Sequence, residues 1–130
     1  WPIEKFLSVA KKISKQNKIP VFFIERNNID LINKIKNEIQ NVLIPELDSN
    51  LSGPPLVTAL SKRLEKAISI DNGIMHMIGL ANIPMTVLFG PTNSKKFSPK
   101  IKNINILDSK ILYNSDEISK IKEEDVLNLI

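Results

Sequence analysis

The sequence of 130 residues contains no cysteine and a single histidine. It therefore has no disulfide framework and no thiolate metal site, and a histidine-rich metal cluster is also excluded. Its longest apolar stretches, such as Ile19–Ile24, are a few residues long, whereas a membrane-spanning helix needs about 20. Aromatic residues make up 5% and are not interleaved with arginine, which argues against a stacking platform for single-stranded nucleic acid.

The chain begins at Trp1, and no signal-peptide pattern follows it. We therefore expect a piece of a longer protein, with room for a single domain over residues 1–130. Hydrophobic residues make up 42% and charged residues 25%, as in ordinary globular proteins and unlike disordered or low-complexity chains. The net charge is +4, and nearly all of the positive charge is lysine. It is compatible with phosphate-bearing ligands, anionic membranes and nucleic acid, but it is also typical of a solvated surface.

Short apolar runs alternate with segments of helical periodicity along the whole chain. The pattern predicts strands over 20–24, 42–44, 67–70, 85–89 and 104–107, and a loop over 48–55. It predicts helices that start at Pro2, at Asn27 or Asn28, near Leu56 (to 66), at Gly73 (to 81) and near Glu123 (to 130). This alternation is typical of right-handed crossover units. We predict an α/β, Rossmann-like three-layer domain with a mostly parallel sheet of about five or six strands and helices on both faces.

Ligands of such sheets bind beyond the carboxyl ends of the strands, and the strand predicted at 67–70 ends in a distinctive segment. Asp71 is suited to accept hydrogen bonds from sugar hydroxyls. Asn72 and Gly73 open the next helix, whose start favours a phosphate, and Gly73 is able to take a positive φ that lets a ligand approach the backbone. His76, one turn later, is suited to donate to a phosphate oxygen. The same residues also suit an ordinary turn in which Asp71 caps the helix and His76 is structural.

Gly90 and Thr92 follow the strand predicted at 85–89. Together with Pro91 they indicate a rigid loop, from which the Thr92 hydroxyl would reach a phosphate or a ribose; an ordinary turn is the alternative. Because parallel strands end at one edge of a sheet, we expect this loop to lie beside Asp71, and that convergence favours a ligand site.

These residues resemble the signature of glycosyltransferase family 9, the bacterial heptosyltransferases that use ADP-heptose to build the lipopolysaccharide inner core. The matching features are, in the order of the family, Trp1-Pro2, Asp71-Asn72-Gly73, His76, Ile83-Pro84 and Phe89-Gly90-Pro91-Thr92. The resemblance covers essentially the whole chain and is most specific between Ile70 and Pro99.

The resemblance implies the carboxyl-terminal, donor-binding half of a GT-B fold, with the acceptor domain absent. Matched by position, Asp71 would contact the donor sugar, Gly73 and the backbone around Asn72 the diphosphate, and His76 the phosphates, while Gly90 and Thr92 would flank the donor. The implied reaction transfers a heptose-like sugar from a nucleoside diphosphate sugar, ADP-heptose, to a lipopolysaccharide core acceptor. The catalytic base is expected on the amino-terminal domain, so this piece alone should be inactive, and neither a cofactor nor a metal is implied.

The resemblance also implies partners and a location. The expected partners are the nucleotide-sugar donor and a lipid-linked or oligosaccharide acceptor, without nucleic acid. The expected location is the cytoplasm, with peripheral contact at an anionic inner membrane left open. Lys95, Lys96 and Lys100 would steer the anionic donor or contact that membrane, unless they are ordinary exposed lysines.

Three positions depart from the family pattern. Asn72 replaces the usual Thr, so the side-chain amide would have to take over the contact of a hydroxyl. No glycine turn follows the strand at 20–24, so the ribose-binding acid is either Asp30 or Glu25. Pro54-Pro55 replaces the usual Thr-Ser before a helix. Two alternatives therefore stay open: a nucleotide-sugar-binding module without catalysis, and an unrelated α/β protein-interaction domain.

Overall fold

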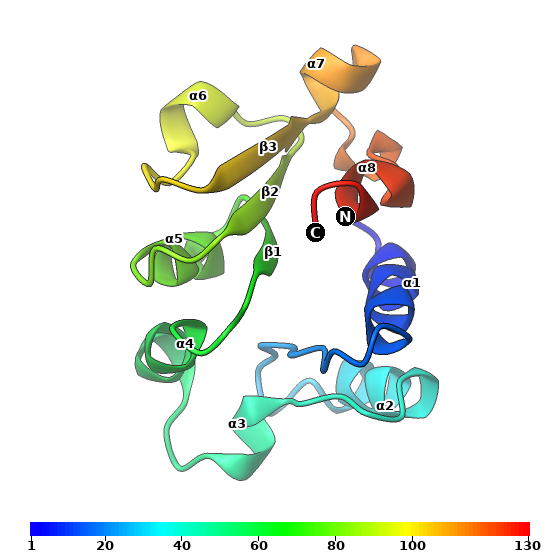
Figure 1. The fold of residues 1–130 in the computed structure, drawn as a ribbon, viewed down its shortest axis with the longest axis vertical. Coiled ribbons are helices and arrows are strands. Elements are labelled where there is room, and N and C mark those ends of the chain that lie inside the picture. Colours follow the sequence, from blue (N-terminus) through cyan, green and yellow to red (C-terminus); the bar gives the residue numbers. More distant parts are fainter. The chain divides into compact units, whose positions relative to one another are not determined.

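The computed structural model describes all residues from 1 to 130 as a mixture of helices and parallel strands (Figure 1). The elements in chain order are α1 (Ile3–Ser14), α2 (Ile29–Glu38), α3 (Pro45–Asp48), α4 (Gly53–Ser61), β1 (Ala67–Ile70), α5 (Gly73–Gly79), β2 (Met85–Phe89), α6 (Ser94–Phe97), β3 (Ile104–Asp108), α7 (Ser109–Tyr113), the 3₁₀ helix η1 (Ile118–Lys120) and α8 (Glu123–Leu127).

The chain forms two compact units. The N-terminal unit comprises Pro2–Leu56, and the C-terminal unit comprises Val57–Ile130 together with Trp1. The single domain expected over residues 1–130 stays a prediction.

The C-terminal unit contains a three-stranded parallel sheet in the order β1-β2-β3. Every residue of the central strand β2 is buried, as expected for a parallel strand covered on both faces. The two crossovers advance in the same direction, so right-handed connections place α5 and α6 on one face. Figure 1 shows α5 on one side of the strands and α8 on the other. This confirms the predicted α/β class with a parallel sheet.

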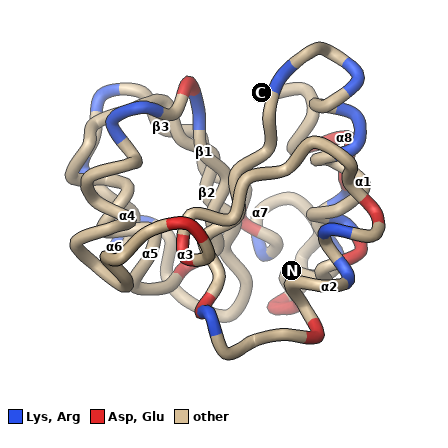
Figure 2. The backbone as a smooth tube through the Cα atoms, turned by 90° about the horizontal axis from the view of Figure 1, so that it is seen from below, with Lys and Arg blue, Asp and Glu red and all other residues tan.

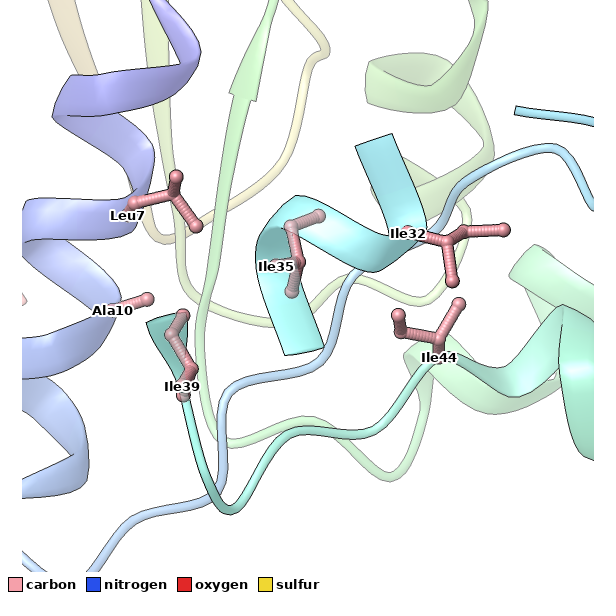
Figure 3. Close-up of a cluster of buried hydrophobic side chains, with 6 residues drawn as sticks. All are labelled: Leu7, Ala10, Ile32, Ile35, Ile39 and Ile44. Atoms are coloured by element: carbon pink, nitrogen blue, oxygen red, sulfur yellow. The ribbon is translucent and has the colours of Figure 1, made fainter. Parts of the chain in front are cut away.

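The N-terminal unit is held together by an aliphatic core between α1 and α2 (Figure 3). The side chains of this core are Leu7, Ala10, Ile32, Ile35, Ile39 and Ile44. Those from α2 recur every three or four residues, as a helix with one buried face requires. Side chains from the segment at 20–24, including Phe22 and Ile24, pack against this core while remaining partly exposed.

The prediction of five or six strands is wrong in number. The segments at 20–24 and 42–44 meet in one parallel bridge, Val21 with Leu43, and do not form named strands. Two backbone hydrogen bonds of 2.9 Å support this bridge, from Phe22 N to Leu43 O and from Leu43 N to Pro20 O. Pro20 has no N–H group to donate, which limits how far the ladder extends.

The helices differ from the predictions mainly at their ends. Pro2 is the N-cap of α1 rather than its first residue, a one-residue difference within ordinary end definitions. α4 begins at Gly53 and ends at Ser61, so the prolines predicted to lie in a loop occupy its first turn, where a missing N–H costs nothing. α5 and α8 each end earlier than predicted, at Gly79 and Leu127.

Four short helices were not predicted: α3, α6, α7 and η1. Each has five residues or fewer. Such lengths are too short to show helical periodicity.

Candidate functional site

The carboxyl ends of the three strands lie at one edge of the sheet. The register pairs Ile70 with Leu88 and Phe89 with Asp108. Asp71 therefore lies beside Phe89, the last residue of β2. The loop that starts at Gly90 begins at the next residue of the chain. The structure thus brings the two sequence segments singled out above to the same edge, as parallel pairing requires.

Asn72, not Asp71, caps α5. Asn72 is the N-cap residue, and its Oδ1 accepts a hydrogen bond of 3.1 Å from the backbone N–H of Met75. This satisfies one of the free N–H groups at the helix start. The alternative in which Asp71 serves as the cap is therefore wrong. The side-chain NH₂ group of Asn72 makes no hydrogen bond within the chain, and the residue is exposed.

Asp71 and His76 carry no partner within the chain. Asp71 is half-buried at the end of β1, and His76 is exposed on α5. Neither side chain forms a hydrogen bond or an ion pair. A carboxylate without a partner is able to accept hydrogen bonds from a sugar hydroxyl, and an imidazole without a partner is able to donate to a phosphate oxygen. His76 is not the satisfied buried residue of the structural alternative.

Gly73 does not adopt the positive φ that the sequence suggested. It is the first residue of α5, and Gly53 is the glycine with a left-handed backbone. A Cβ on Gly73 would meet only the mobile end of Met77, at 3.9 Å. A side chain at position 73 would therefore meet only ordinary van der Waals contact within the protein.

Gly90 is closely packed. A Cβ on Gly90 would lie 3.0 Å from the backbone oxygen of Asp116 and 3.0 Å from Cβ of Ile118, so these neighbours would have to shift to admit it. The start of η1 thus lies directly on the loop after β2. Gly90 is buried, so its role in the structure is to admit this close contact.

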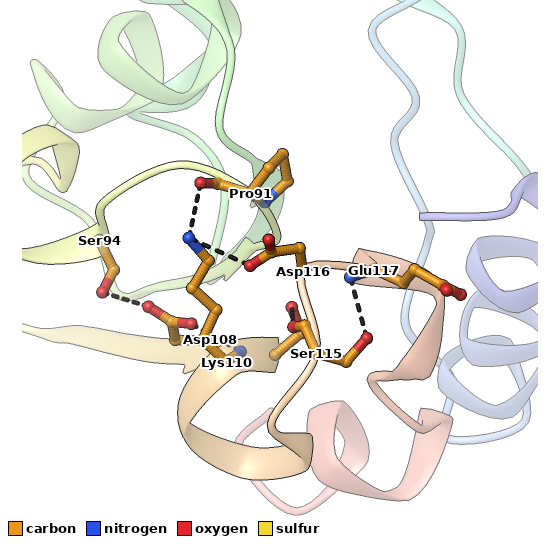
Figure 4. A network of polar contacts seen from close by, with 8 residues as sticks. Pro91, Ser94, Asp108, Lys110, Ser115, Asp116 and Glu117 are labelled. Carbon is orange, nitrogen blue, oxygen red and sulfur yellow. Dashed lines mark hydrogen bonds and ion pairs between the residues drawn. The ribbon is translucent and has the colours of Figure 1, made fainter.

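Thr92 lies in a loop that is tied to the end of β3 (Figure 4). Nζ of Lys110 donates to the Pro91 carbonyl at 2.9 Å and lies 3.1 Å from Oδ1 of Asp116. The hydroxyl of Ser94 donates to Oδ2 of Asp108 at 2.6 Å, in a buried contact. The Thr92 side chain is half-buried and has no partner.

Asp108, Lys110 and Ser94 were not singled out from the sequence. Asp108 is the last residue of β3, and Asp71 directly follows β1. The expectation that ligands bind beyond the carboxyl ends of parallel strands therefore applies to Asp108 as well. Its Oδ1 caps α7 by accepting from Lys110 N at 2.9 Å. Asp108 is 6% exposed, and its carboxylate is fully used within the chain.

α7, which carries Lys110, is itself anchored to α8. The Tyr113 hydroxyl donates to Oδ2 of Asp125, which also accepts from Lys122 N. This hydrogen bond to Asp125, with smaller contributions from burial and charge, raises the pKa of Tyr113 above its ordinary value. The tyrosine therefore stays protonated and keeps donating at neutral and moderately basic pH.

Asp30 and Glu25, the two candidates for a ribose contact, belong to the N-terminal unit. Asp30 is exposed in the first turn of α2, which Asn28 caps by accepting from Leu31 N at 3.4 Å. Glu25 is exposed after the segment at 20–24. The adjacent Arg26 donates to the backbone oxygens of Glu46 and Ser49, at 2.8 and 2.7 Å. The choice between Asp30 and Glu25 remains a prediction.

Charges of both signs are spread along the backbone (Figure 2). Lys95, Lys96 and Lys100 are exposed on α6 or just after it, and Nζ of Lys96 lies 5.1 Å from the centre of the Phe97 ring. No group of three or more acidic or histidine side chains gathers to hold a metal ion. None of the helices combines the length and apolar character needed to cross a membrane.

Comparison with known proteins agrees with this geometry. A family model described as "Glycosyltransferase family 9 (heptosyltransferase)" matches residues 1–127. No curated protein sequence matches the chain significantly. Among solved structures, a family 9 glycosyl transferase from Veillonella parvula superposes with a TM-score of 0.81 at 23% identity, over 99% of this chain.

A second solved structure, the ADP-heptose lipopolysaccharide heptosyltransferase II of E. coli, superposes with a TM-score of 0.76 at 16% identity, over 98% of this chain. At these identities the two structures establish a shared fold. The chain spans 40% of the length of each. Because the family model covers nearly every residue, the chain belongs to glycosyltransferase family 9.

Proposed function

We propose that this chain is the donor-binding part of a glycosyltransferase that takes a heptose-like sugar from a nucleoside diphosphate sugar, with ADP-heptose as donor and a lipopolysaccharide core as acceptor. The observation that carries the proposal is the pair of unpartnered polar side chains, Asp71 and His76, at the carboxyl end of β1. The family match supports the reaction class, and the likeness to the E. coli ADP-heptose lipopolysaccharide heptosyltransferase II supports the donor and the acceptor.

Each side chain has a role that its chemistry permits. Asp71 accepts hydrogen bonds from hydroxyls of the donor sugar. His76 and the NH₂ group of Asn72 donate to the diphosphate, whose negative charge grows as the sugar leaves. Because Gly73 has no side chain, the diphosphate is able to approach the backbone there, and Thr92 follows β2 at the same edge of the sheet. Asp30 or Glu25 would hold the ribose.

The remaining parts of the proposal concern the complete protein. The acceptor-activating base lies outside this chain, so residues 1–130 alone are inactive. No acidic residue occurs between Asp71 and Asp108, whereas four lysines do. This local excess of positive charge supports steering of the anionic donor, and it extends the proposal to peripheral contact with the anionic inner face of a bacterial membrane from the cytoplasm.

The test is calorimetric titration of the complete protein with ADP, UDP, GDP and ADP-heptose. We expect ADP and ADP-heptose to bind most tightly. Asp71→Asn should weaken ADP-heptose more than ADP, because its contact is with the sugar. His76→Ala should weaken both about tenfold, the loss typical of one hydrogen bond to a charged group.

Glu124→Gln is the matched control, because it removes an exposed acid on α8 that has no proposed contact with the donor. It should leave all four affinities unchanged. A folded protein that binds no nucleotide would contradict the proposal, as would unchanged binding in both site variants. Release of ADP on mixing the complete protein with ADP-heptose and lipopolysaccharide core would then establish the transfer itself.

A further inference from the structure

The loop Gly90–Ser94, here called the donor loop, is fastened at its first residues by one ammonium group. Nζ of Lys110 donates to the Pro91 carbonyl at 2.9 Å and pairs with Asp116 at 3.1 Å (Figure 4). The same stretch is in direct contact with the backbone of Asp116, because Gly90 has no Cβ. Lys110 thus joins two segments that already touch.

The end of the donor loop is fastened by Asp108. Its Oδ2 accepts from the Ser94 hydroxyl at 2.6 Å, and its Oδ1 accepts from the backbone N–H of Lys110 at 2.9 Å. Both fastenings therefore originate where β3 ends and α7 begins, in residues two positions apart. Between them, the Thr92 hydroxyl has no partner.

We propose that Lys110 is a positioning residue, which fixes the donor loop so that the Thr92 hydroxyl is presented to the donor. This inference rests on the proposed function. Lys110 acts through the Pro91 carbonyl and Asp116, and the nucleotide does not need to touch it. Asp108 holds the other end of the loop through Ser94, and it caps the first turn of α7.

The exposure of the Lys110–Asp116 pair argues against a mainly stabilising role. The two side chains are 46% and 70% exposed, and ion pairs of this kind contribute little to stability. A hydrogen bond to a carbonyl in a loop nevertheless restricts that loop. We therefore expect Lys110 to affect ligand affinity and loop motion more than unfolding.

The experiment compares Lys110→Met, Lys110→Arg, Asp116→Asn and the wild type in the complete protein. Two quantities are measured: the affinity for ADP, and the backbone N–H order parameters at Thr92 and Asn93, which report fast loop motion. Lys62→Met is the matched control, because it removes an exposed lysine that precedes β1, at the opposite edge of the sheet.

We expect Lys110→Met to weaken ADP about tenfold and to lower both order parameters, with an unchanged melting temperature. Lys110→Arg should recover most of the affinity, since a guanidinium also bonds a carbonyl and a carboxylate. Asp116→Asn should weaken ADP about threefold, in line with an exposed ion pair. Lys62→Met should change neither quantity.

Two results would overturn the inference while leaving the proposed function intact. Unchanged order parameters in Lys110→Met would show that Lys110 does not hold the loop. Tighter ADP binding in Asp116→Asn would show that Lys110 contacts the nucleotide directly, because removing the competing carboxylate frees its charge. If the wild type binds no nucleoside diphosphate, the proposed function is rejected, and the donor is rejected as the ligand of the donor loop. The order parameters of Lys110→Met then decide separately whether Lys110 holds the donor loop.

Discussion

Gly73 and Gly90 occupy the same sheet edge for different physical reasons. A Cβ on Gly90 would lie 3.0 Å from backbone and side-chain atoms of the next segment, whereas a Cβ on Gly73 would meet only the end of Met77 at 3.9 Å. Close packing in the fold favours glycine at position 90. At position 73, a glycine is needed only if a ligand approaches the backbone.

This contrast predicts opposite behaviour for two alanine variants. Gly90→Ala should lower the free energy of unfolding by about 1–3 kcal/mol, because the overlap forces a backbone shift. Gly73→Ala should leave it unchanged or raise it by up to about 1 kcal/mol through helix propensity, while weakening ADP binding. Urea unfolding and calorimetric titration check the two effects. Gly73→Ala with unaltered ADP affinity would remove Gly73 from the site.

The exposed pair Glu4–Lys34 links α1 to α2 within the N-terminal unit, at 2.6 Å. The hydrogen bond from Lys34 lowers the pKa of Glu4, and the same bond raises the pKa of Lys34. The Glu4 contribution to stability is therefore present above the ordinary glutamate range and is lost as pH falls through its lowered pKa. The Lys34 contribution is present below the ordinary lysine range and is lost as pH rises through its raised pKa.

Carbon-detected NMR titration of Glu4 should thus show a pKa below that of an ordinary glutamate. Lys34→Met should return it to the ordinary range. Lys36→Met, which removes a neighbouring exposed lysine of α2, should leave it low. An equal response to both substitutions would mean that general charge, rather than the specific hydrogen bond, sets the pKa.

At the scale of elements, β2 is the strand on which the sheet depends, and it contains one unsatisfied group. Thr86 is fully buried, and its hydroxyl has no hydrogen-bond partner. The hydroxyl of Ser94, by contrast, is buried and bonded to Asp108. A buried hydroxyl destabilises when unpaired and stabilises when paired.

Thr86→Val should therefore raise the free energy of unfolding by about 1 kcal/mol, because it replaces an unpaired hydroxyl by a methyl group of similar size. Ser94→Ala should lower it by about 1–3 kcal/mol, since it leaves a carboxylate oxygen of Asp108 without its partner. Denaturant unfolding of both variants provides the measurement. Destabilisation by Thr86→Val would indicate that the hydroxyl is paired in solution.

At the scale of the whole molecule, the first residue of the chain belongs with the last third. Nε1 of Trp1 donates to the Ile121 carbonyl at 2.9 Å, and Ile121 is fully buried. Trp1 accordingly groups with the C-terminal unit. Trp1 thus has a structural role here.

Trp1→Phe keeps a large aromatic ring and removes the N–H donor. We expect it to lower the free energy of unfolding by about 1 kcal/mol, the usual contribution of one hydrogen bond. Circular dichroism during urea unfolding is the suitable probe, because the variant has no tryptophan fluorescence. Phe97→Leu, at a ring that is 41% exposed, serves as the control and should have a much smaller effect.

Several parts of this protein follow from local sequence. The bounds of β1 and β2 agree with the predicted strands, because Ala67–Ile70 and Met85–Phe89 are short apolar runs between turn residues. Asn28, one of the two residues expected to cap the second helix, is the N-cap of α2. The family also follows from the sequence, since its motifs at Asp71, His76 and Gly90 are contiguous strings.

Other parts required the tertiary structure. The segments at 20–24 and 42–44 have the composition of strands, yet they meet in one bridge, because a strand needs a partner and an apolar run does not specify one. The difference between Gly73 and Gly90 depends on Asp116 and Ile118, residues distant from Gly90 in the chain. The fastening of the donor loop likewise depends on Asp108 and Lys110.

The sequence by itself determined the longer helices, the strands β1, β2 and β3 and which motif residues the chain carries, because periodicity and turn chemistry act between near neighbours. Only the tertiary structure decided which of those residues are closely packed in the fold, as Gly90 is, and which have side chains without a partner in the chain, as Asp71, His76 and Thr92 have. That distinction depends on contacts between segments far apart in sequence, and a local pattern contains no information about them.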